Sequence, residues 1–273
     1  MRQYAVELFR DLGEDRERDR SALRLLDHAL HATVRRAAPI ERPVLLRHLD
    51  LDVPQRPDLL EGADPADVEW LERERSNLVA LVALATEEGL HEYAWRLARS
   101  LWRFCYIRGY FDDITVTHRA GLTAAERSGN RRAQAVMHNY LAVAYRGVGR
   151  LDEAREQHEL ALELGIDSGE RHVQAAVLND LGSTAALCGR SRDAIAAHSQ
   201  ALSIATRIAH PYEQGRALAA LADHLADPGE SRRYRQRALA IFRRMGAPDR
   251  HELERRLAQD SPADPARNGS SAA

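Results

Sequence analysis

The chain has 273 residues, of which 44% are hydrophobic, so it can bury a sizeable core in one or two domains. A formal net charge of −2 gives it no overall attraction to nucleic acid or to an anionic membrane, and we expect neither as a direct partner. Because it lacks an apolar run of about 18 residues and its two cysteines, Cys105 and Cys188, suggest no disulfide framework, we expect a reducing, cytoplasmic setting.

The N-terminal part of the chain, 1–63, predicts a helical segment followed by a connector. Residues 2–12 and 18–37 have the composition of helices, and a Gly-Glu-Asp break separates them. Four prolines interrupt residues 39–63, which we expect to be extended because proline disfavours helix at itself and at the residue before it.

A long run of helices is predicted after the connector. Asp64 followed by Pro65 is typical of a helix start, with Asp64 as the N-cap and Pro65 at the first helical position. We expect the helix 65–88 to be half of a degenerate leading repeat. The regular array then extends from about residue 90 to residue 245.

The C-terminal part is expected to close this array. A strongly polar helix over residues 248–258 suits a cap on a stack of repeats. Residues 64–258 therefore form one predicted repeat domain. The tail 259–273 is rich in Pro, Ser, Gly and Ala and is predicted to be disordered.

Four glycines at a constant spacing, about 40 residues apart, reveal an internal repeat. They are Gly109, Gly149, Gly189 and Gly229, and eight positions before each stands a leucine: Leu101, Leu141, Leu181 and Leu221. Thirteen positions after each stands another large apolar residue: Leu122, Leu162, Leu202 and Phe242. Each copy predicts a helix, a tight turn at the glycine and a second helix, because glycine adopts a left-handed helix end without steric cost.

A helix hairpin cannot bury its apolar face alone, so neighbouring hairpins must stack. The runs Leu141–Ala154 (LAVAYRGVGRLDEA) and Leu181–Ala194 (LGSTAALCGRSRDA) resemble tetratricopeptide (TPR) repeats. The resemblance implies an all-α fold, a TPR-like α-solenoid in which helix hairpins form a right-handed superhelix. The period here is about 40 residues against about 34 in the family, which implies longer helices.

A wider resemblance covers most of residues 1–258. The opening Tyr4-Ala5-Val6-Glu7, the stretch 90–98 (LHEYAWRLA) and the stretch from Phe104 to Tyr110 resemble the repeat-bearing region of multidomain actinomycete transcriptional regulators. In that family an NB-ARC-type nucleotide-binding module, often preceded by a SARP-type DNA-binding domain, stands before such repeats. The chain contains no lysine, which excludes a phosphate-loop lysine, so NTPase activity is not carried over.

The first helix of each hairpin is expected to line a concave partner-binding groove. Positions −5, −2, +2 and +5 from the repeated leucine share one helical face. The candidates for a peptide or protein partner are Arg96, Arg99, Arg103, Tyr106, Asn139, Val143, Arg146, Asn179, Ser183 and Arg216.

Two groups within this set carry the chemistry. Asn139 and Asn179 occupy the same phase, and their amides could bond the backbone of an extended peptide. Arg96, Arg99 and Arg103 could hold a carboxylate or phosphate in bidentate fashion. The alternative for both groups is a solvated polar face with no ligand.

Other reactive side chains favour structural roles. His118, His158 and His198 recur with the same period, but stacked helices lie about 10 Å apart, too far for one metal centre, so this column is expected to pack. Cys105 lies in an apolar helix and is expected to be buried. We predict no catalytic residue, no metal and no cofactor.

The favoured hypothesis is a non-enzymatic interaction and ligand-sensing module of a transcriptional regulator. The alternative is a free-standing TPR adaptor or scaffold, and an enzyme on a helical scaffold is a third, less favoured hypothesis. A homo-oligomer stays open.

Overall fold

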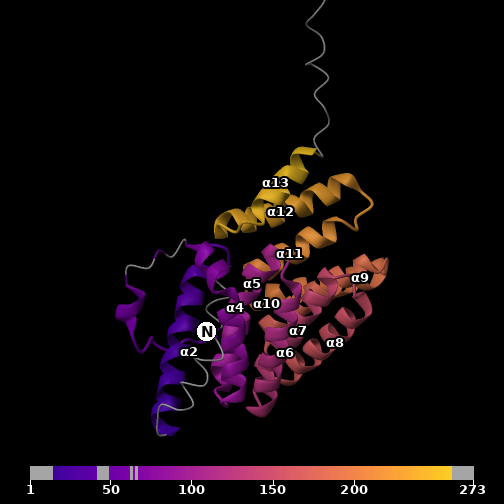
Figure 1. The fold of residues 1–273 in the computed structure, drawn as a ribbon. Helices are drawn as coiled ribbons and strands as arrows, with labels where there is room; N and C mark the ends of the chain where they lie inside the picture. Colours follow the sequence, from indigo (N-terminus) through magenta and orange to yellow (C-terminus); the bar gives the residue numbers. More distant parts are fainter. Residues whose placement is uncertain (1–14, 42–48, 62–63, 65–66, 260–273) are drawn as a thin grey trace, which may run out of the picture. The chain divides into compact units, whose positions relative to one another are not determined.

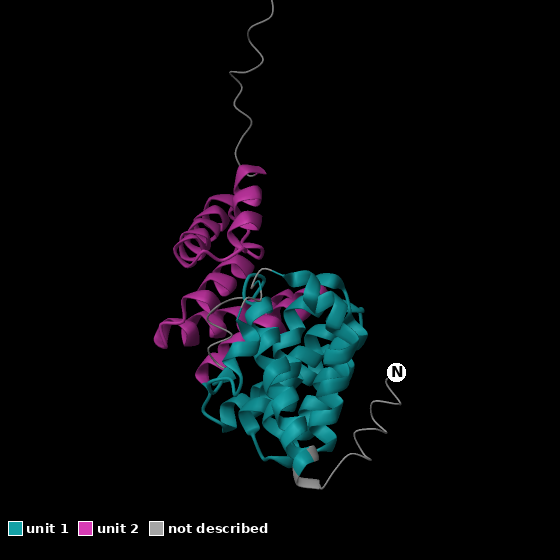
Figure 2. Cartoon of the chain, turned by 60° about the vertical axis from the view of Figure 1, so that its left-hand side comes forward, with its two compact units in different colours: residues 1–170 teal, residues 171–273 magenta. Residues whose placement is uncertain are grey.

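The computed structural model describes residues 15–41, 49–61, 64 and 67–259, in which eleven α-helices and one 3-10 helix occur and no strand (Figure 1). The helix expected at 2–12 and nearly all of the expected tail lie outside these residues. The chain divides into two compact units, residues 1–170 and 171–273 (Figure 2). The boundary between them falls inside the predicted 64–258 repeat domain.

The first unit contains six of the α-helices and the 3-10 helix. They are α2 (Asp15–Ala37), η2 (Pro57–Leu60), α4 (Val68–Glu87), α5 (His91–Arg108), α6 (Phe111–Arg127), α7 (Arg131–Gly147) and α8 (Leu151–Asp167). Helices α5 with α6 and α7 with α8 form two successive hairpins, while α2 and α4 pack against α5. The order of helices in the predicted repeats is therefore confirmed in this unit.

The start of α4 differs from the prediction. The helix begins at Val68, and Asp67 is the N-cap, because its side chain accepts a hydrogen bond from the Trp70 backbone N–H at 3.0 Å. Asp64 is therefore not the cap, and Pro65 lies outside the described residues. Both aspartates suit a helix start, and the residue that satisfies an otherwise unpaired N–H of the first turn decides between them.

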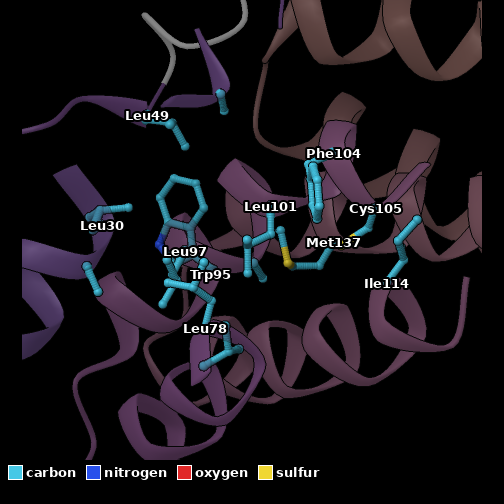
Figure 3. Packing of buried hydrophobic residues seen from close by; sticks show 14 of the residues in the cluster. Leu30, Leu49, Leu78, Trp95, Leu97, Leu101, Phe104, Cys105, Ile114 and Met137 are labelled. Atoms are coloured by element: carbon cyan, nitrogen blue, oxygen red, sulfur yellow. The ribbon is translucent and has the colours of Figure 1, made fainter. Parts of the chain in front are cut away.

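The core of the first unit gathers side chains from all of its long helices except α8 (Figure 3). Leu30 of α2, Leu78 of α4 and Met137 of α7 meet the apolar face of α5, which contributes Trp95 and Leu101. This packing makes α5 the central helix of the unit. Two of its neighbours, α2 and α7, come from parts of the chain that are far apart in the sequence.

Helices pack closely where the repeat places small residues. Gly121 of α6 belongs to a buried column with Ala161 and Ala201. A Cβ at Gly121 would lie 2.7 Å from the Met137 sulfur, which is closer than such atoms approach, and 3.3 Å from the Trp95 Cα, which is a tight contact. The small residue therefore lets α6 approach both α5 and α7.

The second unit contains α9 (Arg171–Leu187), α10 (Ser191–Arg207), α11 (Pro211–Ala222), α12 (Pro228–Met245) and α13 (Arg250–Gln259). Helices α9 with α10 and α11 with α12 form hairpins, and α13 packs on α12. The predicted cap helix is therefore present, and Leu253 and Leu257 bury its apolar side.

The last predicted turn is wrong in its details. Gly229 lies in the first turn of α12 and does not connect two helices. Helix α11 ends at Ala222, and Asp227 caps α12 by accepting hydrogen bonds from the Gly229 and Glu230 backbone N–H groups. Pro228 fits the first helical position because it has no N–H to satisfy there.

The connections between helices recur at half the period seen in the sequence. Glycines with positive φ occur at Gly89, Gly109, Gly129, Gly149, Gly169 and Gly189. The following residue donates its N–H to a carbonyl one helical turn earlier, as Arg150 does to Tyr145 at 2.9 Å, which is the Schellman pattern. The next connection uses Ala209 at φ 50° with the same bond, from His210 to Ala205.

We predict that Gly189→Ala lowers the unfolding free energy of the second unit by about 1 kcal/mol, because a Cβ disfavours the left-handed region. Ala209→Gly should raise it by a similar amount, because that residue already occupies the region. Gly229→Ala, whose φ is helical, is the matched control and should leave the stability unchanged or raised. Urea unfolding followed by circular dichroism measures all three, and a loss at Gly229 equal to that at Gly189 would contradict the assignment.

Candidate functional site

The two asparagines proposed for the partner-binding groove are bonded to histidines inside the hairpins. Asn139 of α7 accepts a hydrogen bond from His158 of α8, with 3.1 Å between Oδ1 and Nδ1. Asn179 of α9 and His198 of α10 repeat this pair at 3.2 Å. Each pair joins the first helix of a hairpin to the second, so two columns that the sequence shows separately are partners.

Burial limits what these asparagines can do. Asn139 is 5% exposed and Asn179 is 1% exposed. The Asn179 amide nitrogen also donates to the Glu213 carboxylate at 2.8 Å and to the Glu213 backbone carbonyl at 3.1 Å. The structure therefore places both amides in the hairpin interior, and not in the open position expected for peptide binding.

The first and fourth hairpins depart from this pairing. Arg99 stands where the later repeats have asparagine, and His118 instead donates from Nδ1 to the Ile114 carbonyl at 2.9 Å. In the fourth hairpin both positions are alanine, Ala219 and Ala238. The histidine column is buried, as expected, and its polar atoms follow the partner that each hairpin supplies.

A charged network surrounds Arg216 in the second unit. Its guanidinium donates to Asp180 at 2.6 Å and to Glu213 at 3.0 Å. Asp180 and Glu213 are buried, so the arginine neutralises charge that would otherwise be costly there. Ser183, also in the predicted set, donates to the Asn179 carbonyl and remains half-buried.

In the first unit, Arg99 binds a carboxylate of the chain itself. Its Nη1 donates to Glu41 Oε2 at 3.0 Å, and the Trp102 indole Nε1 donates to the same oxygen at 3.0 Å. The Arg99 side chain is 5% exposed and that of Glu41 is 0% exposed. One residue earlier along the chain, the Ile40 carbonyl accepts a hydrogen bond from Arg103 at 3.3 Å.

Aromatic rings complete this arrangement. Trp102 stacks on Tyr140 of α7 with 4.4 Å between ring centroids, and the Arg99 guanidinium lies 4.8 Å from the Tyr140 ring centroid. Tyr106 packs beside Trp102 at 5.4 Å. We call Arg99, Trp102 and Tyr140 the Arg99 site. Its guanidinium and indole donors suit a carboxylate, and its stacked rings favour a cation next to them.

The other predicted residues of the first unit lie on the same helical faces. Arg96 pairs with Glu92 at 3.2 Å and, like Arg103, Tyr106 and Arg146, keeps part of its side chain exposed. Val143 is buried. Because α5 and α7 pack against each other, we call Arg96, Arg103, Tyr106 and Arg146, together with the Arg99 site, the α5–α7 face.

Comparison with known proteins identifies the repeat. Residues 133–207 match the model of the tetratricopeptide repeat family. The match extends from the first turn of α7 to the end of α10. These residues form a TPR region. A search of curated proteins finds no significant match.

Solved structures share this fold. The structure of BtubC (BKLC) from P. vanneervenii matches with a TM-score of 0.51 and 20% identity over 71% of this chain and 78% of that chain. The TPR-like repeats of a kinesin light chain from Podosopora anserina match with a TM-score of 0.40 and 17% identity over 64% of this chain and 92% of that chain. The observed helices and the similarity to BtubC show that the chain has the predicted all-α, TPR-like solenoid fold.

Sequence reasoning missed three of the residues that make or fill the Arg99 site. Trp102 occupies a repeat position where Ala142, Gly182 and Ala222 are small, and that exception is the signal that could have identified it. Tyr140 directly precedes the repeated Leu141, a position outside those that are expected to line the groove. Glu41 has no such signal, because it lies outside the repeats.

Cys105 and the buried histidine column have packing roles, whereas Cys188 is exposed. Cys105 is buried as expected, and burial raises the pKa of its thiol to about 12. In the part of the chain that the structure describes, no three His, Cys, Asp or Glu side chains group to hold a metal ion. Within the same residues no helix combines the length and apolarity needed to cross a membrane.

We predict that Asn139→Ala destabilises the first unit by about 1–3 kcal/mol, because it leaves His158 Nδ1 buried without this partner. The three tryptophans all lie in this unit, so urea unfolding followed by tryptophan fluorescence reports on it. Asn77→Ala, at an exposed position of α4, is the control and should change little. An unchanged midpoint for Asn139→Ala would show that the amide is not structural.

Stability should also depend on pH through His118. Burial, opposed by the Ile114 hydrogen bond, lowers the pKa of His118 to about 3. The unfolded chain therefore takes up this proton near pH 6.5 while the folded chain does not, so stability falls as pH decreases below 6.5, by at most about 1.4 kcal/mol per pH unit. Fluorescence-detected unfolding between pH 7.5 and 5 should show a smaller fall for His118→Phe than for the unmodified chain; equal slopes would refute this.

Proposed function

We propose that this chain is a non-enzymatic protein-interaction module that binds an extended acidic segment of a peptide or protein partner on its α5–α7 face. Two findings support the general role. Residues 133–207 form a TPR region, and the TPR fold is typical of non-catalytic scaffolds that bind other proteins. The position and the chemistry of the ligand rest on the residues of the first unit.

One observation carries the proposal. The α5–α7 face brings arginine and aromatic side chains together on two adjacent helices, and Arg96, Arg103, Tyr106 and Arg146 are still partly exposed. A guanidinium next to an aromatic ring is a strong group for recognition, because it can bond a carboxylate in bidentate fashion while its flat surface stacks. Arginine and tyrosine are also among the residues that most often dominate binding energy at protein interfaces.

The proposed binding face contains only part of the predicted groove. Asn139 and Asn179 hold histidines inside their hairpins, so their contribution to a partner is indirect. Each pair joins the two helices of its hairpin, and the Asn139 pair thereby holds α7, the helix that contains Arg146. Arg216 and Ser183 belong to the second unit and stay candidates for a separate contact.

Support for a non-enzymatic role comes from the state of the reactive groups. The thiol of Cys105 is buried with a strongly raised pKa, and a nucleophile requires the thiolate. Burial also lowers the pKa of His198 to about 4, so it is not placed for proton transfer near neutral pH.

We further propose that the module serves as a sensor or autoinhibitory region in a cytoplasmic transcriptional regulator. The support is the resemblance of residues 4–10 and 90–110 to the repeat-bearing region of actinomycete SARP and NB-ARC-type regulators. An NTPase or DNA-binding segment in the same reading frame would favour this role. Its absence from the gene would favour a free-standing adaptor.

The binding proposal is tested with the full chain on a peptide array that contains acidic, neutral and basic sequences of equal length. We expect bound peptides to be enriched in Asp and Glu, and Arg103→Ala to reduce their binding several-fold through loss of one charge-assisted contact. Arg155→Ala removes the same charge from the second helix α8, where Arg155 pairs with Glu159, and is the matched control. Equal losses for the two variants, or no acidic preference, would refute the proposal.

A further inference from the structure

The carboxylate of Glu41 is completely buried, and hydrophobic packing alone does not explain this. Glu41 follows the C-terminal turn of α2, where its backbone N–H donates to the Ala37 carbonyl at 2.8 Å. Its side chain is 0% exposed although carboxylates are normally solvated. Burial of an ionised carboxylate is costly unless donors replace its water, so the groups around it must form a site for that charge.

Two donors to this carboxylate come from the α5–α7 face. Arg99 and Trp102 of α5 both donate to Glu41 Oε2 at 3.0 Å, and Tyr140 of α7 stacks on Trp102. Arg99 occupies the same repeat phase as Asn139 and Asn179. The array therefore binds the carboxylate with side chains of its first helices, at the position where the sequence predicts contact with a partner.

The segment around Glu41 is held in the way that a bound peptide is held. Arg103 donates to the Ile40 backbone carbonyl at 3.3 Å, so one arginine binds the main chain and the other binds the side chain. The Ile40 side chain packs partly buried against the core of the first unit. The segment held here is therefore an aliphatic residue followed by an acidic one.

We infer that the Arg99 site is the carboxylate-binding subsite of the partner-binding face, and that Glu41 occupies it as an intramolecular ligand which an acidic partner segment must displace. This inference rests on the proposed function, since it names the residue that competes with the partner. A ligand in the same chain acts at a high effective concentration, so it weakens the apparent affinity of any competitor. The end of α2 thus restrains binding until a partner with an aliphatic–acidic segment replaces it.

The first experiment asks whether the vacated site binds a carboxylate. In the full chain carrying Glu41→Ala, propionate should raise the melting temperature, because it supplies the missing carboxylate to Arg99 and Trp102. Propionamide at the same concentration and ionic strength should not, and neither compound should shift the unmodified chain. Asp50→Ala is the matched control, and propionate should not raise its melting temperature. Asp50 lies in the same connector and pairs with Arg132, but Asp50 itself is exposed.

The second experiment supplies the natural segment in trans. A fluorescein-labelled, C-terminally amidated peptide with the sequence of residues 36–41 (RAAPIE) should bind Glu41→Ala about ten-fold or more tightly than the unmodified chain, because the internal carboxylate no longer competes for Arg99 and Trp102. The peptide RAAPIQ, likewise amidated at its C-terminus so that it has no carboxylate, should bind neither chain. If Glu41→Ala does not fold by circular dichroism, Glu41→Ser, which also removes the carboxylate and vacates its position, replaces it in both experiments.

The outcomes separate this inference from the proposed function. Absence of propionate rescue, or equal affinity of the RAAPIE peptide for the variant and the unmodified chain, would overturn the role of Glu41. Acidic array peptides that depend on Arg103 but bind equally well with and without Glu41 would leave the proposed function standing and refute the inference. Rescue by propionate without any acidic preference on the array would refute the proposed function, but the Arg99 site would still be a carboxylate-binding site.

Discussion

Each helix of the array must stop and reverse direction within a very short connection, and from Gly89 to Ala209 a left-handed residue at each connection makes this possible. From Gly89 to Gly189 the same turn recurs at a constant spacing. In each turn the N–H of the residue after the glycine donates to a carbonyl in the last turn of the preceding helix. Constant turns between helices of equal length keep equivalent residues at equivalent places in successive hairpins. The columns of the sequence have a structural meaning only because of this regularity.

Two kinds of column use that regularity to hold a hairpin together. Small residues such as Gly121 and Ala161 allow the backbones to approach, and the pairs of Asn139 with His158 and Asn179 with His198 join the facing helices through one hydrogen bond each. A buried polar pair of this kind tolerates little displacement, because a lost bond leaves both groups unsatisfied. The pairs therefore specify how the two helices align.

The Arg99 site arises where the repeat breaks its own pattern. Arg99 replaces the asparagine, Trp102 replaces a small residue, and His118 turns to a backbone carbonyl instead. The first hairpin thus gives up its polar pair and gains two donors that bind the segment after α2. Binding chemistry lies at the exception, while the repeated positions support the scaffold.

The helical class, the hairpin repeat and most helix positions could be predicted from the sequence, because these depend on local propensity, glycine at the turns and periodic apolar residues. The sequence also singled out Arg96, Arg99 and Arg103 as a group able to hold a carboxylate. The sequence did not show that Asn139 and Asn179 face inward, since a polar residue at a given helical phase is compatible with solvent or with a buried partner on the next helix.

The turn between α11 and α12 was predicted at the wrong residue, because Gly229 keeps the spacing of the repeat while Asp227 and Pro228 start the helix before it. The carboxylate that meets Arg99 could not be predicted, because Glu41 lies 58 residues away and tertiary packing, not sequence spacing, brings the end of α2 to α5.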